Sequence, residues 1–232
     1  MPSIPLMILL SVVLGLQIPT SRRSLDAVAR AKPRLQTALA SHGAHLGSPI
    51  YIRIFKTERE LELWVDKGDL YVLFKKYPIC AFSGELGPKL REGDQQSPEG
   101  SYTVRPAQLN PTSTFHPSFN LGYPNEYDRA HSRTGSALMV HGNCVSIGCY
   151  AMTDSYIEEI YAMADAALRN GQREFQVHVF PFRMVQEKMI PLRNSRWYSF
   201  WLELKAGYDA FEQYNRPPRV RVRNRQYVVT SP

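Results

Sequence analysis

The 232-residue chain lacks several features that would place it in a common class of protein. The apolar run at residues 5–16 is too short to span a bilayer comfortably and has the length of a signal-peptide core. No Lys/Arg cluster with interleaved aromatic residues occurs in the middle of the chain, so no nucleic-acid partner is expected. No cysteine forms a lipobox, and no Cys/His pair has zinc-finger spacing.

What is present is the composition of a globular protein with a basic surface. Hydrophobic residues make up 44% of the chain, charged residues make up 21%, and the net charge is +7. A chain of this length is most simply one domain with extensions. Its basic surface suits an anionic partner, such as an anionic lipid or a cell-wall glycan with free carboxylates. Several basic side chains form the solvent face of a predicted C-terminal hairpin: Arg216, Arg219, Arg221, Arg223 and Arg225.

Residues 1–21 are predicted to direct export, as a cleaved signal peptide or an uncleaved N-terminal anchor. They contain no charged side chain, and Arg22 and Arg23 follow the apolar run instead of preceding it. A small-residue sequence that suits signal cleavage, Ala27-Val28-Ala29, lies further downstream. Residues 22–47 are predicted to form a linker or surface helix.

Hydrophobic periodicity predicts a β-rich α+β fold, a sandwich or barrel with a few peripheral helices. Residues of alternating polarity predict strands at 50–55, 60–65, 70–75, 77–83, 102–105, 137–140 and 175–182. Helical spacing predicts one helix that begins near Thr153 or Asp154 and ends at Gly171, and a second over 197–214. A hairpin is expected over 220–229, around Asn224. Residues 106–136 are expected to form a long loop beside the substrate cleft.

The segment from Val140 to Tyr150 carries the strongest chemical signal. A cysteine nucleophile needs a base within reach and backbone N–H groups for the oxyanion. Here Cys149 would be the nucleophile, His141 the base, and the N–H groups of Gly148 and Cys149 the oxyanion hole. Two alternatives stay open. The cysteine could be a small buried hydrophobe, or zinc could bind Cys144, Cys149 and His141.

The chain has only three cysteines, an odd number. If Cys149 is the free nucleophile, Cys80 and Cys144 are candidates for a disulfide in an oxidising compartment. They could equally be two buried thiols.

The motif from His141 to Thr153 resembles the active-site motif of the L,D-transpeptidase (YkuD-type) catalytic domain family, and within it the YafK-like branch. Further segments fit the same branch in order: Ser48 to Lys56, Ser83 to Lys89, Ser97 to Tyr102, Gly122 to His131, Pro181 to Met184 and Lys205 to Asp209. The broader family usually has a histidine where this chain has Ile147. It also has a longer loop between the histidine and the cysteine, which here lie eight positions apart.

This resemblance implies a YkuD-like catalytic domain at 48–185 and a C-terminal helical and hairpin extension at 186–232. It implies a periplasmic enzyme of cell-wall biogenesis and cell shape that acts on peptidoglycan stem peptides. A thioester would form at the meso-diaminopimelate carbonyl, with no metal, no other cofactor and no obligate protein partner. The favoured outcome is hydrolytic release of the outer-membrane lipoprotein from peptidoglycan. The alternatives are an L,D-transpeptidase that forms cross-links or attaches the lipoprotein, and a secreted wall-binding module without catalysis.

The remaining site predictions concern support and substrate binding. The resemblance implies that a backbone carbonyl orients His141. Gly142 and Ser146 are expected to support the site, Ser146 as a hydroxyl within the turn. Arg129 could hold a substrate carboxylate, because a guanidinium binds one bidentately, or could form an ion pair with Asp128. Asp128 and Tyr150 are further candidates for substrate binding.

Overall fold

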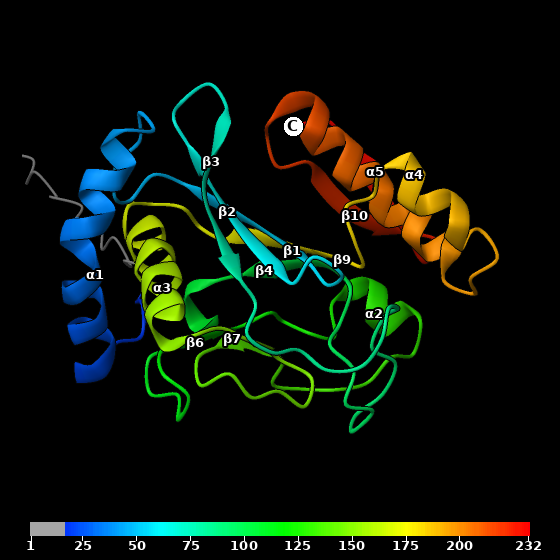
Figure 1. The fold of residues 1–232 in the computed structure, drawn as a ribbon, viewed down its shortest axis with the longest axis horizontal. Helices are drawn as coiled ribbons and strands as arrows, with labels where there is room; N and C mark the ends of the chain where they lie inside the picture. Colours follow the sequence, from blue (N-terminus) through cyan, green and yellow to red (C-terminus); the bar gives the residue numbers. More distant parts are fainter. Residues whose placement is uncertain (1–16) are drawn as a thin grey trace, which may run out of the picture.

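A computed structural model describes residues 17–232, so the apolar run at 5–16 lies outside the described residues (Figure 1). The longer helices are α1 (Arg22–Ala40), α3 (Asp154–Arg169) and α5 (Tyr198–Tyr214); α2 (Glu126–Ala130) and α4 (Gln186–Met189) are short. The strands are β1 (Ile50–Phe55), β2 (Glu60–Asp66), β3 (Tyr71–Pro78), β4 (Gly100–Val104), β5 (Leu109–Asn110), β6 (Ser118–Asn120), β7 (Met139–His141), β8 (Tyr150–Ala151), β9 (Phe175–Phe180), β10 (Arg219–Arg223) and β11 (Gln226–Thr230). In the described part of the chain, no helix has both the length and the apolar character of a membrane span.

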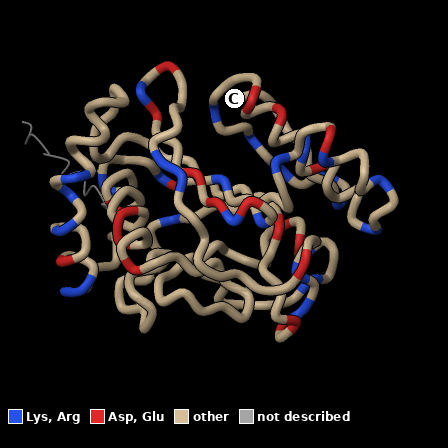
Figure 2. The backbone as a smooth tube through the Cα atoms, viewed as in Figure 1, with Lys and Arg blue, Asp and Glu red and all other residues tan. Residues whose placement is uncertain are grey.

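The strands form three open sheets. The largest has the order β3-β2-β1-β9-β4, in which β1 and β9 are parallel and all other neighbours are antiparallel. A smaller sheet has the order β5-β6-β7-β8, in which β7 and β8 are parallel, and β10 pairs only with β11. The region of β6 and β7 carries almost no charged residues (Figure 2). The β-rich α+β prediction is confirmed, and because no sheet closes within residues 17–232, the barrel version of it is wrong.

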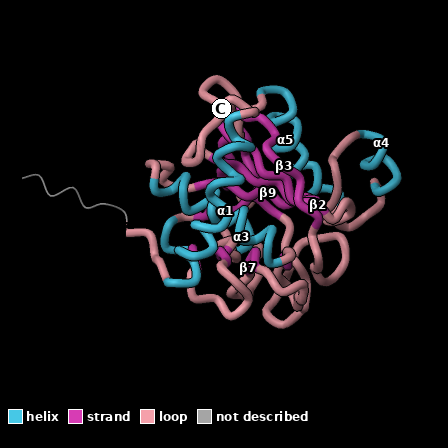
Figure 3. The backbone as a smooth tube through the Cα atoms, turned by 60° about the vertical axis from the view of Figure 1, so that its left-hand side comes forward, coloured by secondary structure: helices cyan, strands magenta, loops and turns pink. Residues whose placement is uncertain are grey.

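Strand β1 is buried on both faces, so even its one charged residue, Arg53, is buried and paired with Glu62 at 2.7 Å. Its even-numbered residues, Ile50, Ile52 and Ile54, belong to the main core with α3 and the inner side of α1. On the other face the ring of Phe211, from α5, lies 4.8 Å from the ring of Tyr51. Figure 3 shows the large sheet between α5 on one side and α1 and α3 on the other. The C-terminal extension therefore covers a sheet face that would otherwise be open.

Two predicted elements differ from the structure. A separate strand at 77–83 is wrong, because β3 runs on to Pro78, which has no N–H to continue a ladder. Beyond it only Ala81 forms a bridge, with Ala151 of β8. The region 106–136 is not one loop, since it contains β5, β6 and α2. The other predicted strands and helices and the C-terminal hairpin are confirmed; the hairpin turns at Asn224 and Arg225, both with positive φ as its two-residue turn requires.

A fully buried carboxylate, that of Glu99, links distant parts of the fold. It lies 3.1 Å from the Lys56 ammonium and accepts hydrogen bonds from the Gly87 N–H at 2.7 Å and the Trp201 indole N–H at 2.9 Å. Burial lowers the pKa of Lys56, and the charge of Glu99 opposes that shift. Because both groups are buried, removal of one of them would leave the charge of the other buried without a partner.

We expect Glu99→Gln to lower the free energy of unfolding by about 3–5 kcal/mol, because it leaves the Lys56 ammonium buried without its counter-charge. Urea unfolding followed by circular dichroism measures the loss. The matched control is Asp209→Asn, which removes the carboxylate from the exposed Lys205–Asp209 pair and should cost under about 1 kcal/mol. Equal costs for the two substitutions would contradict the importance of the buried pair. Adding Lys56→Met to Glu99→Gln should restore part of the lost stability.

Candidate active site

The parallel pairing of β7 and β8 brings the predicted nucleophile and base to one face of the small sheet. Val140 pairs with Tyr150, and His141 pairs with Ala151. Cys149 therefore lies beside Met139, whose backbone N–H donates to the Cys149 Sγ at 3.3 Å. Since side chains two residues apart share a face of a strand, His141 projects to the same side as Met139. Both Cys149 and His141 line one pocket of about 660 Å³.

The imidazole of His141 is oriented by the carbonyl of the next residue. Nδ1 of His141 lies 2.6 Å from the carbonyl oxygen of Gly142, which can only accept a hydrogen bond. Nδ1 therefore carries the proton in the neutral ring, and Nε2 is left as the base. The side chain is 5% exposed, and the ring of Phe115 packs 5.3 Å from it. Gly142 thus supplies the orienting carbonyl that was expected but not identified.

Burial favours the uncharged form of both Cys149 and His141. Burial raises the pKa of Cys149, although the Met139 N–H and the charge of Lys89 oppose this rise. Burial also lowers the pKa of His141, against the effect of the Gly142 carbonyl. No hydrogen bond joins Cys149 to His141 among the described residues. Because burial favours the uncharged form of each group, we expect the thiol to lose its proton during attack.

Two hydroxyls fix the backbone of the nucleophile. The Ser146 Oγ donates to the Cys149 carbonyl at 2.7 Å and accepts from the Gly148 N–H at 3.1 Å. The fully buried Ser97 Oγ donates to the same carbonyl at 3.1 Å. Because the Gly148 N–H is occupied, it is not free for an oxyanion in this conformation. Among described residues the Cys149 N–H donates no hydrogen bond, which leaves it as the oxyanion donor.

Glycine is required at two positions around the nucleophile. Gly148 has φ +146°, a conformation that other residues rarely adopt. A Cβ on Gly142 would lie 2.6 Å from the Asp154 Oδ1, which caps the loop by accepting from the Asn143 N–H at 2.8 Å. Gly142 therefore lets the start of α3 approach the strand that carries His141.

The loop between His141 and Cys149 is tied to the neighbouring segment by a disulfide. Cys144 is bonded to Cys80, with a Cα–Cα distance of 5.1 Å, and Cys149 is the free cysteine. Asn143 and Cys144 both have positive φ, which an unrestrained chain would rarely adopt. A sulfur in a disulfide is not a thiolate ligand, so the zinc alternative loses Cys144. In the part of the chain that the structure describes, no group of three or more His, Cys, Asp or Glu side chains could hold a metal ion.

The walls of the cysteine pocket come from the predicted loop at 106–136 and from the segment between His141 and Cys149. No Asp, Glu, Lys or Arg lines it, in keeping with the uncharged region of Figure 2. One wall is Asn110, Thr112, Ser113, Thr114 and Phe115; the opposite rim is Val145, Ser146 and Ile147. The part of the predicted loop up to Phe115 does border the cleft. The sequence places Ser97 only in a segment that resembles the family, and its serine-proline sequence carries no signal for a contact 52 residues away.

Three predicted substrate-binding residues lie outside the cysteine pocket. Asp128 is fully buried and pairs with Arg133 at 2.8 Å, so the suggested Asp128–Arg129 pair is not formed. Arg129 is exposed, donates to the Pro124 carbonyl and lines a different pocket. Tyr150 is fully buried, and its hydroxyl donates to the Pro98 carbonyl at 2.7 Å. Its side chain points away from the Cys149 face, as alternation along a strand requires.

We expect the double substitution Cys80→Ser, Cys144→Ser to lower the free energy of unfolding by about 2–4 kcal/mol, because it removes a cross-link between residues 64 apart. Activity should fall as well, since the loop next to Cys149 is released. Peptide mapping without reductant tests the bond itself. Cys149→Ser is the control, because it should leave the Cys80–Cys144 peptide intact. Two titratable thiols besides Cys149 in the native protein would contradict the pairing.

Comparison with known proteins identifies the family of the chain. Residues 49–185 match the L,D-transpeptidase catalytic domain family, YkuD. The chain is 51% identical over 187 residues to the Escherichia coli K12 protein named "Putative L,D-transpeptidase YafK", a match that covers 81% of this chain and 76% of that protein. Among solved structures it resembles the helical cell shape determining protein Pgp2 from Campylobacter jejuni, with TM-score 0.46, 16% identity and coverage of 80% of this chain and 79% of that one. It also resembles Bd1075 from Bdellovibrio bacteriovorus, with TM-score 0.41, 18% identity and coverage of 76% and 78%. The match over most of the chain, together with the extent of its identity to the Escherichia coli protein, shows that the chain belongs to the L,D-transpeptidase catalytic domain (YkuD) family.

Proposed function

We propose that the protein is a periplasmic cysteine amidase that hydrolyses a bond at the meso-diaminopimelate carbonyl of a stem peptide and so releases the outer-membrane lipoprotein from peptidoglycan. Family membership supports the coarser part of this statement, a peptidoglycan-modifying enzyme that acts on stem peptides. The observation that carries the proposal is the placement of Cys149 and a correctly oriented His141 in one pocket.

The reaction begins from the neutral pair. His141 Nε2 takes the proton of the Cys149 thiol as the sulfur attacks the substrate carbonyl carbon. The resulting oxyanion accepts a hydrogen bond from the Cys149 N–H. The Ser146 and Ser97 hydroxyls hold that N–H in place because both donate to the carbonyl of Cys149. When the tetrahedral intermediate collapses, the C–N bond breaks and the imidazolium gives its proton to the leaving amine. A thioester on Cys149 remains.

The second half of the reaction decides between hydrolase and transpeptidase. His141 deprotonates the second nucleophile, whose attack forms a new bond to the carbonyl carbon and returns the thiol. The rim made by the short loop favours water as that nucleophile. Ile147 is 82% exposed and Val145 is 53% exposed, and the disulfide at Cys144 holds the loop where it is. A rim so short leaves little surface to bind an acceptor peptide in competition with water.

Location and leaving group belong to the same proposal. A disulfide beside the nucleophile suits an oxidising compartment such as the periplasm. The pocket has no charged side chain along its walls, so it suits the uncharged backbone and methylene groups of a lysine side chain joined through an amide. A lysine of the lipoprotein is such a leaving group.

The direct test is incubation of the purified protein with murein sacculi that carry or lack the attached lipoprotein, followed by muropeptide chromatography. Tripeptide stems and free lipoprotein should rise, with little new cross-linking. Cys149→Ala and His141→Ala should each reduce turnover by on the order of 10³-fold or more while the fold is kept. A rise in direct diaminopimelate–diaminopimelate cross-links would contradict the proposed hydrolysis and indicate a transpeptidase instead. Near-normal turnover by Cys149→Ala would overturn the whole mechanism.

The pH dependence follows from the directions of the two pKa shifts. Because burial lowers the pKa of His141 below its ordinary 6.5, the imidazole stays neutral down to lower pH, and the acid limb of kcat/KM should lie below pH 6.5. Because burial raises the pKa of Cys149 above 9.0, alkylation by iodoacetamide should keep rising past pH 9.

Both profiles can be measured between pH 4.5 and 10.5. His45→Ala, outside the pocket, is the control and should leave the acid limb in place. An alkylation rate that is already constant between pH 5 and 8 would mean a standing thiolate–imidazolium pair, contrary to this prediction.

A further inference from the structure

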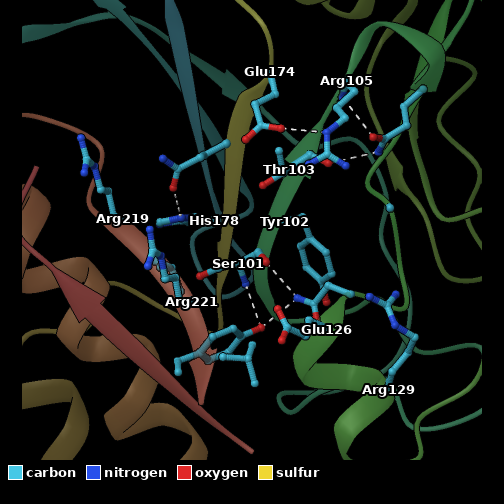
Figure 4. Close-up of a pocket in the computed structure, with 17 residues that line it drawn as sticks. Ser101, Tyr102, Thr103, Arg105, Glu126, Arg129, Glu174, His178, Arg219 and Arg221 are labelled. Carbon is cyan, nitrogen blue, oxygen red and sulfur yellow. Dashed lines mark hydrogen bonds and ion pairs between the residues drawn. The ribbon is translucent and has the colours of Figure 1, made fainter.

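A second pocket, of about 480 Å³, lies on the other side of the large sheet's edge strand and shares no lining residue with the cysteine pocket. Its floor is the outer face of β4 and β9, where Ser101 pairs with His178 and Thr103 with Gln176 (Figure 4). The opposite faces of these strands, with Tyr102 and Val177, belong to the main core. A polar floor over an apolar core is the usual solvent face of a sheet, but here further elements enclose it.

Arginines from separate elements surround this floor. In Figure 4, Arg219 and Arg221 stand on β10 at one side, Arg105 lies above, and Arg129 lies on the α2 side. Arg105 is already paired with Glu174 at 2.8 Å. The guanidinium groups of Arg219 and Arg221 form no hydrogen bond and no ion pair with any described residue, and Arg129 has no carboxylate partner there. The pocket therefore holds uncompensated positive charge.

The floor also has unused hydrogen-bonding groups. The hydroxyls of Ser101 and Thr103 make no hydrogen bond within the described chain. His178 adds no charge, because burial and the nearby Arg53 lower its pKa to about 3, and its Nε2 donates to the Gln176 Oε1 at 2.9 Å. One lining carboxylate, that of Glu126, is exposed and has no cationic partner among described residues. The pocket thus offers guanidinium groups, hydroxyls and one free carboxylate.

We propose that this pocket binds the charged end of a murein stem peptide other than the one being cleaved, and so anchors the enzyme on its polymeric substrate. This inference rests on the proposed function. The free guanidinium groups fit carboxylates, which they can hold bidentately. The hydroxyls fit peptide amides, and Glu126 fits the ammonium group of a diaminopimelate. A phosphate would use the arginines, but it has no ammonium group to pair with Glu126.

The test is co-sedimentation with purified sacculi, with every protein carrying Cys149→Ala so that no turnover occurs. Arg219→Gln with Arg221→Gln should weaken binding by about tenfold or more, the loss of two charge-assisted contacts. The matched control is Arg223→Gln with Arg225→Gln, which removes the same charge from the same hairpin outside the pocket and should change binding less than about twofold. With Cys149 intact, the Arg219/Arg221 variant should cleave a short soluble stem peptide at a rate within about twofold of the parent protein, which also shows that it folds.

The chemistry of the occupant is tested with stripped sacculi. The difference between parent and Arg219/Arg221 variant should vanish on sacculi from which an amidase has removed the stem peptides. If the two double substitutions weaken binding to sacculi equally, the effect is one of net charge, and the proposed binding pocket is wrong. Displacement by inorganic phosphate at low millimolar concentration, or preferential binding to anionic phospholipid vesicles through Arg219 and Arg221, would overturn the peptide assignment. If the parent protein cleaves nothing yet the binding differences hold, the proposed function fails and this pocket stands.

Discussion

The fold depends on one buried ion pair, between Glu99 and Lys56, and on the tetrapeptide that contains it, Ser97-Pro98-Glu99-Gly100. The Glu99 side chain binds Lys56 next to β1 and Trp201 on α5, so it ties the large sheet to the C-terminal extension. The two residues before it reach the active site instead: Ser97 binds the carbonyl of Cys149, and the Pro98 carbonyl receives the hydroxyl of Tyr150. One tetrapeptide therefore contacts both the buried ion pair and the backbone of the nucleophile.

Burial also influences the charge of the catalytic pair. Both groups are partly removed from solvent, and this burial shifts each of them toward its uncharged form. Charges then arise only during the reaction, when the Cys149 N–H and the Gly142 carbonyl are already aimed at them. The hydrogen bonds that fix the conformation of the loop therefore also place groups that stabilise the oxyanion and the imidazolium when they form.

The sequence was sufficient where the information is local. His141 ends β7 and Cys149 directly precedes β8, with one short loop between them. The alternation of residue types in β1, β2 and β9 likewise reflects the two faces of each strand. It was insufficient where contacts are distant. Asp128 pairs with Arg133, and the Tyr150 hydroxyl donates to the Pro98 carbonyl. The residues next to Asp128 and Tyr150 in the sequence do not indicate these contacts, because a polar residue can face either a core or a cleft. The covering of β1 by α5 is likewise a contact across about 150 residues.

The disulfide between Cys80 and Cys144 has a practical consequence for handling the enzyme. Reducing agents are the ordinary means of keeping a cysteine nucleophile from oxidising, but here the same agent also attacks the cross-link beside it. Once the disulfide is opened, Cys144 carries a second thiol five residues before Cys149. This thiol could react with electrophilic probes or form a disulfide with Cys149 itself. Storage conditions that protect most cysteine enzymes would thus create, in this one, a competitor for its own nucleophile.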